Sequence, residues 1–161
     1  MKRKTLQLAL FSWILLGAQM VSAQFTGGDN AGYASSRSDD ILYDGVDPVV
    51  TGDELPDVVN NLTILNPGGV TLSKDIIVNG DLQVLDGDLD LNGNEITLGD
   101  NATVTETPGN TISGGEGGVS VTQNLDDLAD GVNIANLGLE LTSDEPLGET
   151  TINLSLIHIS E

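Results

Sequence analysis

The sequence predicts an all-β protein, a right-handed parallel β-solenoid with β-helix-like repeats of about 20 residues. Apolar residues recur in pairs at positions i and i+2, and turns rich in glycine, asparagine and aspartate separate the pairs. Alternation with a period of two indicates short strands that bury one face. The pairs are Leu62/Ile64, Val70/Leu72, Ile76/Val78, Leu82/Val84, Leu89/Leu91, Ile96/Leu98 and Ala102/Val104.

The spacing of these pairs favours stacked coils. Leu62, Leu82 and Ala102 follow one another at intervals of 20 residues. Three short strands in about 20 residues form one solenoid coil, which buries its apolar face only against neighbouring coils. Asn-Gly pairs also favour two-residue hairpins, so an antiparallel β-meander or sandwich is the alternative. Two further pairs at an interval of 19 or 20 residues are Ile76 with Ile96 and Val70 with Leu89.

The N-terminal residues 1–23 are expected to be a signal-peptide helix. Lys2-Arg3-Lys4 provide the basic start, and an apolar stretch runs from Leu6 to Leu16. Val21-Ser22-Ala23 place small residues at a signal-peptidase site. The apolar stretch is shorter than a membrane-spanning helix needs, so we expect a mature, exported chain without a transmembrane segment.

Two segments are expected between the signal and the C-terminal residues 154–161. Residues 24–60 are interpreted as a linker and irregular lead-in, because Pro48 and Pro56 stand there among short valine pairs. Residues 61–153 form the β-repeat region, in which the glycine-rich stretch 105–118 predicts a longer loop or a loosened coil.

The C-terminal residues 154–161 differ in pattern from the rest. Leu154-Ser155-Leu156-Ile157-His158-Ile159-Ser160-Glu161 resembles the translation of a sequencing adapter used in transposase-made libraries. We therefore interpret residues 154–161 as an artefact and expect the gene-encoded sequence to be cut off at about Asn153, within a strand. His158, the one histidine of the chain, is for this reason discounted as a catalytic base or metal ligand.

The excess of acidic over basic residues argues against nucleic acid and anionic lipid as partners. The chain has 25 acidic and 5 basic residues, and only Arg37 and Lys74 remain basic after the signal. Such a surface repels nucleic acid and anionic lipid. The chain also has no cysteine, which excludes disulfides and thiol chemistry.

Six stretches of the chain share one repeat pattern: Asn61–Ile64, Gly69–Ser73, Ile76–Leu82, Gly87–Gly99, Asn133–Thr142 and Leu147–Ile152. These stretches resemble the N-terminal part of type IX secretion cargo proteins, which are bacterial surface or secreted proteins that end in a C-terminal sorting domain. This resemblance implies export across a Gram-negative outer membrane, a place at the cell surface or outside the cell, and an adhesin-like or structural role. No sorting domain is present in the sequence, as truncation would cause.

One stretch is a candidate calcium loop. Oxygen-bearing side chains at alternate positions suit calcium, which takes six to eight oxygen ligands. The twelfth position of the loop is Gly99, where an EF-hand has glutamate. Carboxylates that point to solvent from a strand are therefore the alternative. The candidate ligands are Asp86, Asp88, Asp90 and Asn92.

The expected function is that of a non-catalytic, extracellular, structural or adhesin-like β-repeat segment. No catalytic and no cofactor-binding residue is predicted, and calcium is the one candidate ion. Expected partners are a glycan, matrix or cell-surface protein, together with the export machinery. The alternative is that the segment forms the leading coils, or a spacer, of a polysaccharide-processing enzyme whose catalytic part lies elsewhere.

Overall fold

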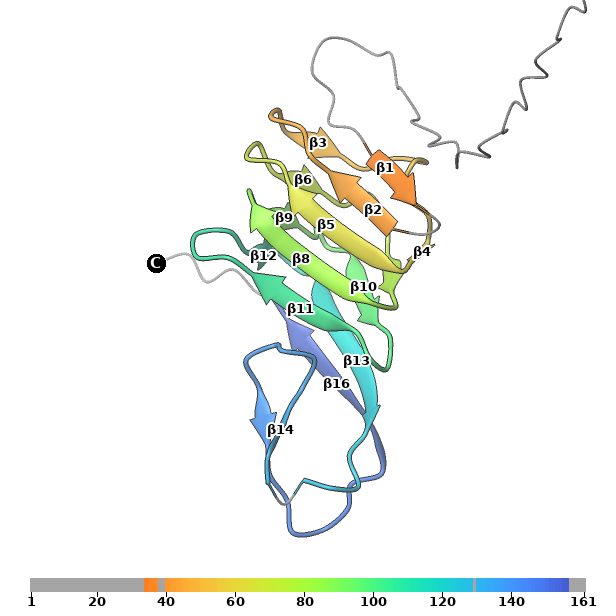
Figure 1. The fold of residues 1–161 in the computed structure, drawn as a ribbon, viewed down its shortest axis with the longest axis vertical. Coiled ribbons are helices and arrows are strands. Elements are labelled where there is room, and N and C mark those ends of the chain that lie inside the picture. The colour runs from red at the N-terminus through yellow and green to blue at the C-terminus, as the bar shows by residue number, and fades with distance from the viewer. Residues whose placement is uncertain (1–33, 38–39, 129, 157–161) are drawn as a thin grey trace, which may run out of the picture.

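The computed structural model describes residues 34–37, 40–128 and 130–156, and it is a parallel β-solenoid of about four coils. Each coil contributes three short strands, and the coils stack along the long axis of the molecule (Figure 1). Coils 1 and 2 consist of β2 (Asp40–Tyr43), β3 (Val49–Val50) and β4 (Val58–Val59), then β5 (Asn61–Leu65), β6 (Val70–Thr71) and β7 (Ile76–Val78). Coils 3 and 4 consist of β8 (Asp81–Asp86), β9 (Leu89–Asp90) and β10 (Glu95–Leu98), then β11 (Thr103–Glu106), β12 (Ile112–Ser113) and β13 (Gly118–Asn124).

The coils form three sheets, one along each side of the solenoid. Sheet A contains β2, β5, β8 and β11; sheet B contains β3, β6, β9 and β12; sheet C contains β4, β7, β10 and β13. Neighbouring strands from successive coils are parallel in all three sheets. The predicted parallel solenoid is therefore confirmed over the antiparallel meander or sandwich.

The core follows from the alternation in the sequence. Inward positions carry valine, leucine and isoleucine, and equivalent positions of adjacent coils lie on one another. Leu62 and Leu82, for example, are partners in β5 and β8 and are both fully buried. Branched aliphatic side chains suit this packing because they fill a thin, pleated core. Among the described residues, no buried side-chain nitrogen or oxygen lacks a hydrogen-bond partner.

The predicted register is right for three of the four intervals. Leu62 with Leu82, Ile76 with Ile96, and Val70 with Leu89 are strand partners. The interval from Leu82 to Ala102 is wrong, because Leu82 pairs with Val104. Residues 99–102 form a wider corner, closed by the Ala102 amide donating to the Gly99 carbonyl at 3.0 Å, and this delays the next strand. The repeat is accordingly about 21 residues.

The irregular lead-in predicted for residues 24–60 is wrong where the structure describes it. Residues 40–59 form coil 1, in register with coil 2. Pro48 and Pro56 do not interrupt this coil, because each lies in a corner outside the strands. The glycine-rich stretch 105–118 belongs to coil 4, because it holds the end of β11, all of β12, which pairs with β9, and the first residue of β13.

The corner between β8 and β9 requires a glycine, Gly87. Gly87, between β8 and β9, has a φ of 77°, and a Cβ there would lie 1.8 Å from the Asn66 carbonyl oxygen. Asn66 is itself fully buried in the corresponding corner of coil 2. Its side-chain amide donates to the Asp47 carbonyl at 2.9 Å, and its side-chain oxygen accepts from the Gly68 amide at 2.9 Å. The corner thus satisfies its polar groups without water.

The N-terminal end of the core is covered. Strand β1 (Ala34–Arg37) pairs antiparallel with β2 and so closes that edge of sheet A. Between the positions that pair in sheets B and C, coil 1 has two residues more than coil 2, and this longer loop, residues 51–57, places the fully buried Leu55 in the core. Tyr43 is also fully buried, and its hydroxyl donates to Glu54 Oε1 at 3.1 Å. Burial, together with the nearby Glu54 carboxylate, raises the pKa of Tyr43 above its ordinary value.

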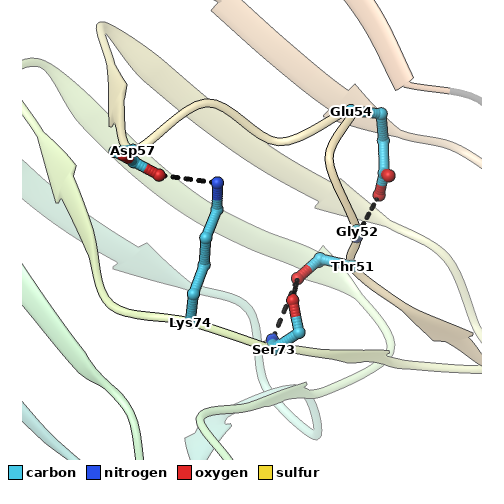
Figure 2. Close-up of polar contacts among 6 residues, drawn as sticks. All are labelled: Thr51, Gly52, Glu54, Asp57, Ser73 and Lys74. Atoms are coloured by element: carbon cyan, nitrogen blue, oxygen red, sulfur yellow. Dashed lines mark hydrogen bonds and ion pairs between the residues drawn. The ribbon is translucent and has the colours of Figure 1, made fainter.

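The loop 51–57 is tied to coil 2 by side-chain contacts (Figure 2). Thr51 Oγ1 accepts from the Ser73 amide at 3.0 Å and lies 3.2 Å from the Ser73 hydroxyl. Lys74 Nζ pairs with Asp57 Oδ1 at 2.6 Å. That ion pair is largely exposed and contributes about 0–1 kcal/mol, so buried Leu55 and Tyr43 dominate this end of the core.

The C-terminal edges are covered in three different ways. In sheet C, β16 (Glu149–Ser155) pairs antiparallel with β13. In sheet A, the Val104 amide donates to the Ala135 carbonyl at 2.9 Å, and Asn136 Nδ2 donates to the Val104 carbonyl at 2.7 Å. In sheet B, Glu106 Oε1 accepts from the Ile112 amide at 2.6 Å. Parallel stacking in sheet C therefore ends at coil 4 within the described residues.

The chain between β13 and β16 leaves the solenoid and projects beyond coil 4 (Figure 1). It holds the small antiparallel pair β14 (Val132–Asn133) and β15 (Glu140–Leu141). Leu154 and Ser155, the first residues of the predicted adapter-like tail, end β16. The predicted signal peptide and residues 157–161 lie outside the described residues, and the interpretation of the tail as an artefact stays a prediction.

Candidate functional site

The four candidate calcium ligands are divided by a corner of the solenoid. Asp86 ends β8 in sheet A, whereas Asp90 belongs to β9 in sheet B. Asp88 lies in the corner between them, and its Oδ1 accepts from the Thr111 amide at 2.9 Å. Asp90 Oδ1 accepts from the Asn92 amide at 2.8 Å. Asn92 Nδ2 donates to the Leu72 carbonyl at 3.3 Å.

These contacts give the residues structural roles. Asp88 and Asp90 each accept a backbone N–H, and Asn92 joins coil 3 to coil 2. Three or more acidic or histidine side chains placed to hold a metal ion are not found in the part of the chain that the structure describes. The physical reason is the change of chain direction at Gly87, which turns neighbouring carboxylates onto different sheets.

The outer face of sheet A presents a different arrangement, which we call the sheet A face. Its outward side chains form two rows across β2, β5, β8 and β11, with one residue per coil in each row. Adjacent strands lie about 4.8 Å apart, so the rows repeat at that spacing. The first row is Asp40, Asn61, Asp81 and Thr103, and the second is Leu42, Thr63, Gln83 and Thr105.

The first row is a continuous hydrogen-bonded ladder. Asn61 Nδ2 donates to Asp40 Oδ1 at 2.8 Å, and the Asp81 amide donates to Asn61 Oδ1 at 2.7 Å. Thr103 Oγ1 donates to Asp81 Oδ1 at 2.7 Å. A donor therefore stands between the two carboxylates, which avoids the repulsion of stacked like charges.

The second row supplies the polar groups that face solvent. Thr63 Oγ1 lies 3.5 Å from Gln83 Oε1, at the limit of a hydrogen bond. Both side chains are half-buried, so they retain free hydrogen-bonding capacity while their positions are restricted by the strands.

The two rows border an open depression of about 390 Å³ on the sheet A face. Carboxylate, amide and hydroxyl groups surround it, and Leu42 gives it an apolar edge. This donor and acceptor set suits a ligand rich in hydroxyl groups. The lining residues are Asp40, Ile41, Leu42, Asn61, Thr63, Asp81 and Gln83.

None of these lining residues is among the predicted site residues. One signal in the sequence could have identified them. In each coil, a polar residue stands directly before the apolar pair of the sheet A strand. Asn61 precedes Leu62 in this way, and Asp81 precedes Leu82. The role of this position becomes visible only when the coils are stacked and the polar residues face one another.

A second cavity, of about 340 Å³, lies beside coil 4 at the C-terminal end. Val104, Ile112 and Val119 contribute apolar side chains from coil 4, and Leu154 and Leu156 contribute from the chain end. Glu106, Thr111 and Asn136 add polar groups, but Glu106 Oε1 already accepts from the Ile112 amide and Asn136 Nδ2 already donates to the Val104 carbonyl.

The polar cluster of Figure 2 places two hydroxyl groups near a lysine, and a hydroxyl beside a lysine can act as a nucleophile. Lys74 Nζ is directed to Asp57, and the Thr51 and Ser73 hydroxyls contact each other. The geometry therefore uses these groups to join two coils.

Comparison with known proteins identifies no relative: no family model, curated protein or solved structure matches the chain. Within the described residues, no helix is long and apolar enough to cross a membrane.

Proposed function

We propose that this chain is a non-catalytic, exported β-solenoid segment that acts as an adhesin-like structural module and binds a hydroxyl-rich glycan on its sheet A face. The observation that carries the proposal is the pair of polar rows on that face. The rows set carboxylate, amide and hydroxyl groups at a regular spacing on a rigid support.

Rigidity supports the proposal because a binding surface on packed strands loses little conformational entropy when a ligand binds. The side chains beneath the face, such as Leu62 and Leu82, are fully buried. Asp40, Asn61 and Asp81 are held by the ladder before any ligand arrives. The face also repeats from coil to coil, as a polymer of repeated sugar units does.

Charge supports the choice of a glycan over a phosphate-bearing partner. The lining of the depression contains Asp40 and Asp81 and no basic residue. Nucleic acids and anionic lipids would be repelled there, whereas a neutral polysaccharide would not. Export is supported by the basic, apolar and small-residue pattern of residues 1–23.

The proposal is tested with the mature chain, residues 24–161, on an array of neutral and charged polysaccharides. We expect retention of a neutral polysaccharide that Thr63→Ala and Gln83→Ala each weaken severalfold, because each removes a polar group from the depression. Thr97→Ala, an exposed position on sheet C, is the matched control and should bind as the wild type does. Equal binding by all variants would contradict the assignment to the sheet A face. Cleavage of the bound polysaccharide would favour the polysaccharide-processing alternative.

A further inference from the structure

Two Asn-Gly pairs of the chain stand in different structural settings. Asn79-Gly80 lies at the corner between β7 and β8, and Asn92-Gly93 lies in the loop between β9 and β10. Asn-Gly is the dipeptide most prone to spontaneous deamidation, because glycine has no side chain to hinder attack by its backbone nitrogen. The local structure determines whether that attack can occur.

Asn92-Gly93 is open. Asn92 and Gly93 have φ angles of 50° and 81°, and the turn is closed by the Asn94 amide donating to the Leu91 carbonyl at 2.8 Å. Both central residues are exposed, and a Cβ on Gly93 would meet nothing within 4 Å. Within the described residues, the Gly93 amide has no hydrogen-bond acceptor.

Asn79-Gly80 is held on both sides. The Gly80 amide donates to the Asn60 carbonyl at 2.6 Å, and the Asn79 amide donates to the Val59 carbonyl at 3.0 Å. Gly99 of the next coil lies against Asn79, since a Cβ on Gly99 would be 2.9 Å from the Asn79 Cα. Attack by the Gly80 nitrogen would require its hydrogen bond to break and the corner to move.

We propose that Asn92-Gly93 is a site of spontaneous, non-enzymatic deamidation in the folded protein and that Asn79-Gly80 is protected by the solenoid. The Gly93 nitrogen loses its proton to solvent base and attacks Cγ of Asn92. The Cγ–Nδ2 bond breaks, and Nδ2 takes up a proton and leaves as ammonia. Water then opens the five-membered imide at either carbonyl, so one water is consumed and aspartate or isoaspartate results.

The modification changes the charge of this corner. A new carboxylate forms beside Asp90, whose own carboxylate accepts from the Asn92 amide. The hydrogen bond from Asn92 Nδ2 to the Leu72 carbonyl is lost. Asn94 Nδ2 donates to the same carbonyl at 3.1 Å, so the contact between coils 2 and 3 remains. The solenoid should therefore tolerate the modification.

The test is incubation of the folded mature chain at mildly alkaline pH, followed by mass spectrometry of chymotryptic peptides. Asn92 is expected to convert severalfold faster than Asn79 in the folded chain, and the two rates should become similar in urea. Asn92→Gln should remove the early gain in mass, whereas Asn79→Gln should leave it unchanged. Equal rates at the two sites in the folded wild-type chain would overturn the proposal, whatever the variants do.

Discussion

The polar ladder of the sheet A face makes a sharp prediction for Asn61→Asp. The substitution keeps the shape of the side chain but replaces the amide donor by a carboxylate. The new carboxylate can still accept from the Asp81 amide, as Asn61 Oδ1 does at 2.7 Å. It can no longer donate to Asp40 Oδ1, and it places three carboxylates in one row.

The expected loss of stability follows from two contributions. The lost hydrogen bond to Asp40 costs about 1 kcal/mol. Each new carboxylate pair, one strand spacing apart, costs about 1 kcal/mol in a water-like dielectric and about 3 kcal/mol at a partly shielded surface. Because Asp81 is exposed, the lower value applies to the pair with Asp81, and the free energy of unfolding should fall by about 3–5 kcal/mol at neutral pH.

The effect should depend on pH with a definite sign. Repulsion raises the pKa of the introduced carboxyl in the folded state above its unfolded value of about 3.9. The variant therefore loses stability relative to the wild type as pH rises from about 3.9 through the raised pKa of the folded state. Below about pH 3.9 the loss disappears, because a protonated carboxyl can again donate to Asp40. Urea unfolding followed by circular dichroism, at neutral and acidic pH, measures the difference.

Asn101→Asp is the matched control, because Asn101 is exposed in the corner before β11 and lies outside the ladder. It adds the same charge to the same acidic chain. If Asn61→Asp and Asn101→Asp lose equal stability at neutral pH, the reasoning about the ladder is refuted. If the stability that Asn61→Asp loses at neutral pH is also lost in acid, the contribution assigned to carboxylate repulsion is refuted, but the contribution of the lost hydrogen bond is not.

Four further predictions concern the two ends of the solenoid and its metal dependence. Tyr43→Phe should reduce the loss of stability that the wild type shows as pH rises above about 10, because the buried Tyr43 phenol resists ionisation in the fold but ionises freely in the unfolded chain; alkaline urea melts test this. Leu55→Ala should cost about 2–5 kcal/mol by opening a cavity, whereas the half-exposed control Leu65→Ala should cost much less in the same melts. Asn136→Ala should cost about 1–2 kcal/mol in thermal unfolding, since it removes a donor to Val104 and places alanine at a left-handed φ. A calcium chelator should leave the melting temperature unchanged, and a clear drop would instead support calcium binding by Asp86, Asp88, Asp90 and Asn92.

The coils themselves are predictable from the sequence because the core is simple. Pairs such as Leu62/Ile64 and Leu82/Val84 alternate with a period of two, and only one face of each strand can be buried. Coil 1 is harder to predict, because its two prolines, Pro48 and Pro56, suggest irregular chain. Ile41 and Tyr43 carry the same alternation, and a search for it 21 residues before Leu62 would have revealed the coil.

The candidate site and the ends of the solenoid were less predictable. The ladder requires the exact register, which shifts at the corner 99–102 and so places Thr103 beside Asp81. The covered edges depend on long-range contacts, such as Glu106 with the Ile112 amide, that no local pattern encodes. Asp86 and Asp90 of the candidate calcium loop lie on different sheets, because the chain turns at Gly87 and alternate positions share a face only while a strand stays straight.

The most direct test of the account is an amide NMR titration of the mature chain with a neutral polysaccharide that the array retains. The account predicts shift changes concentrated on the sheet A face, at Leu42, Thr63, Gln83 and Thr105, with sheets B and C unchanged and the polysaccharide intact. Changes concentrated on sheet B or C, or release of shortened sugar chains, would contradict it.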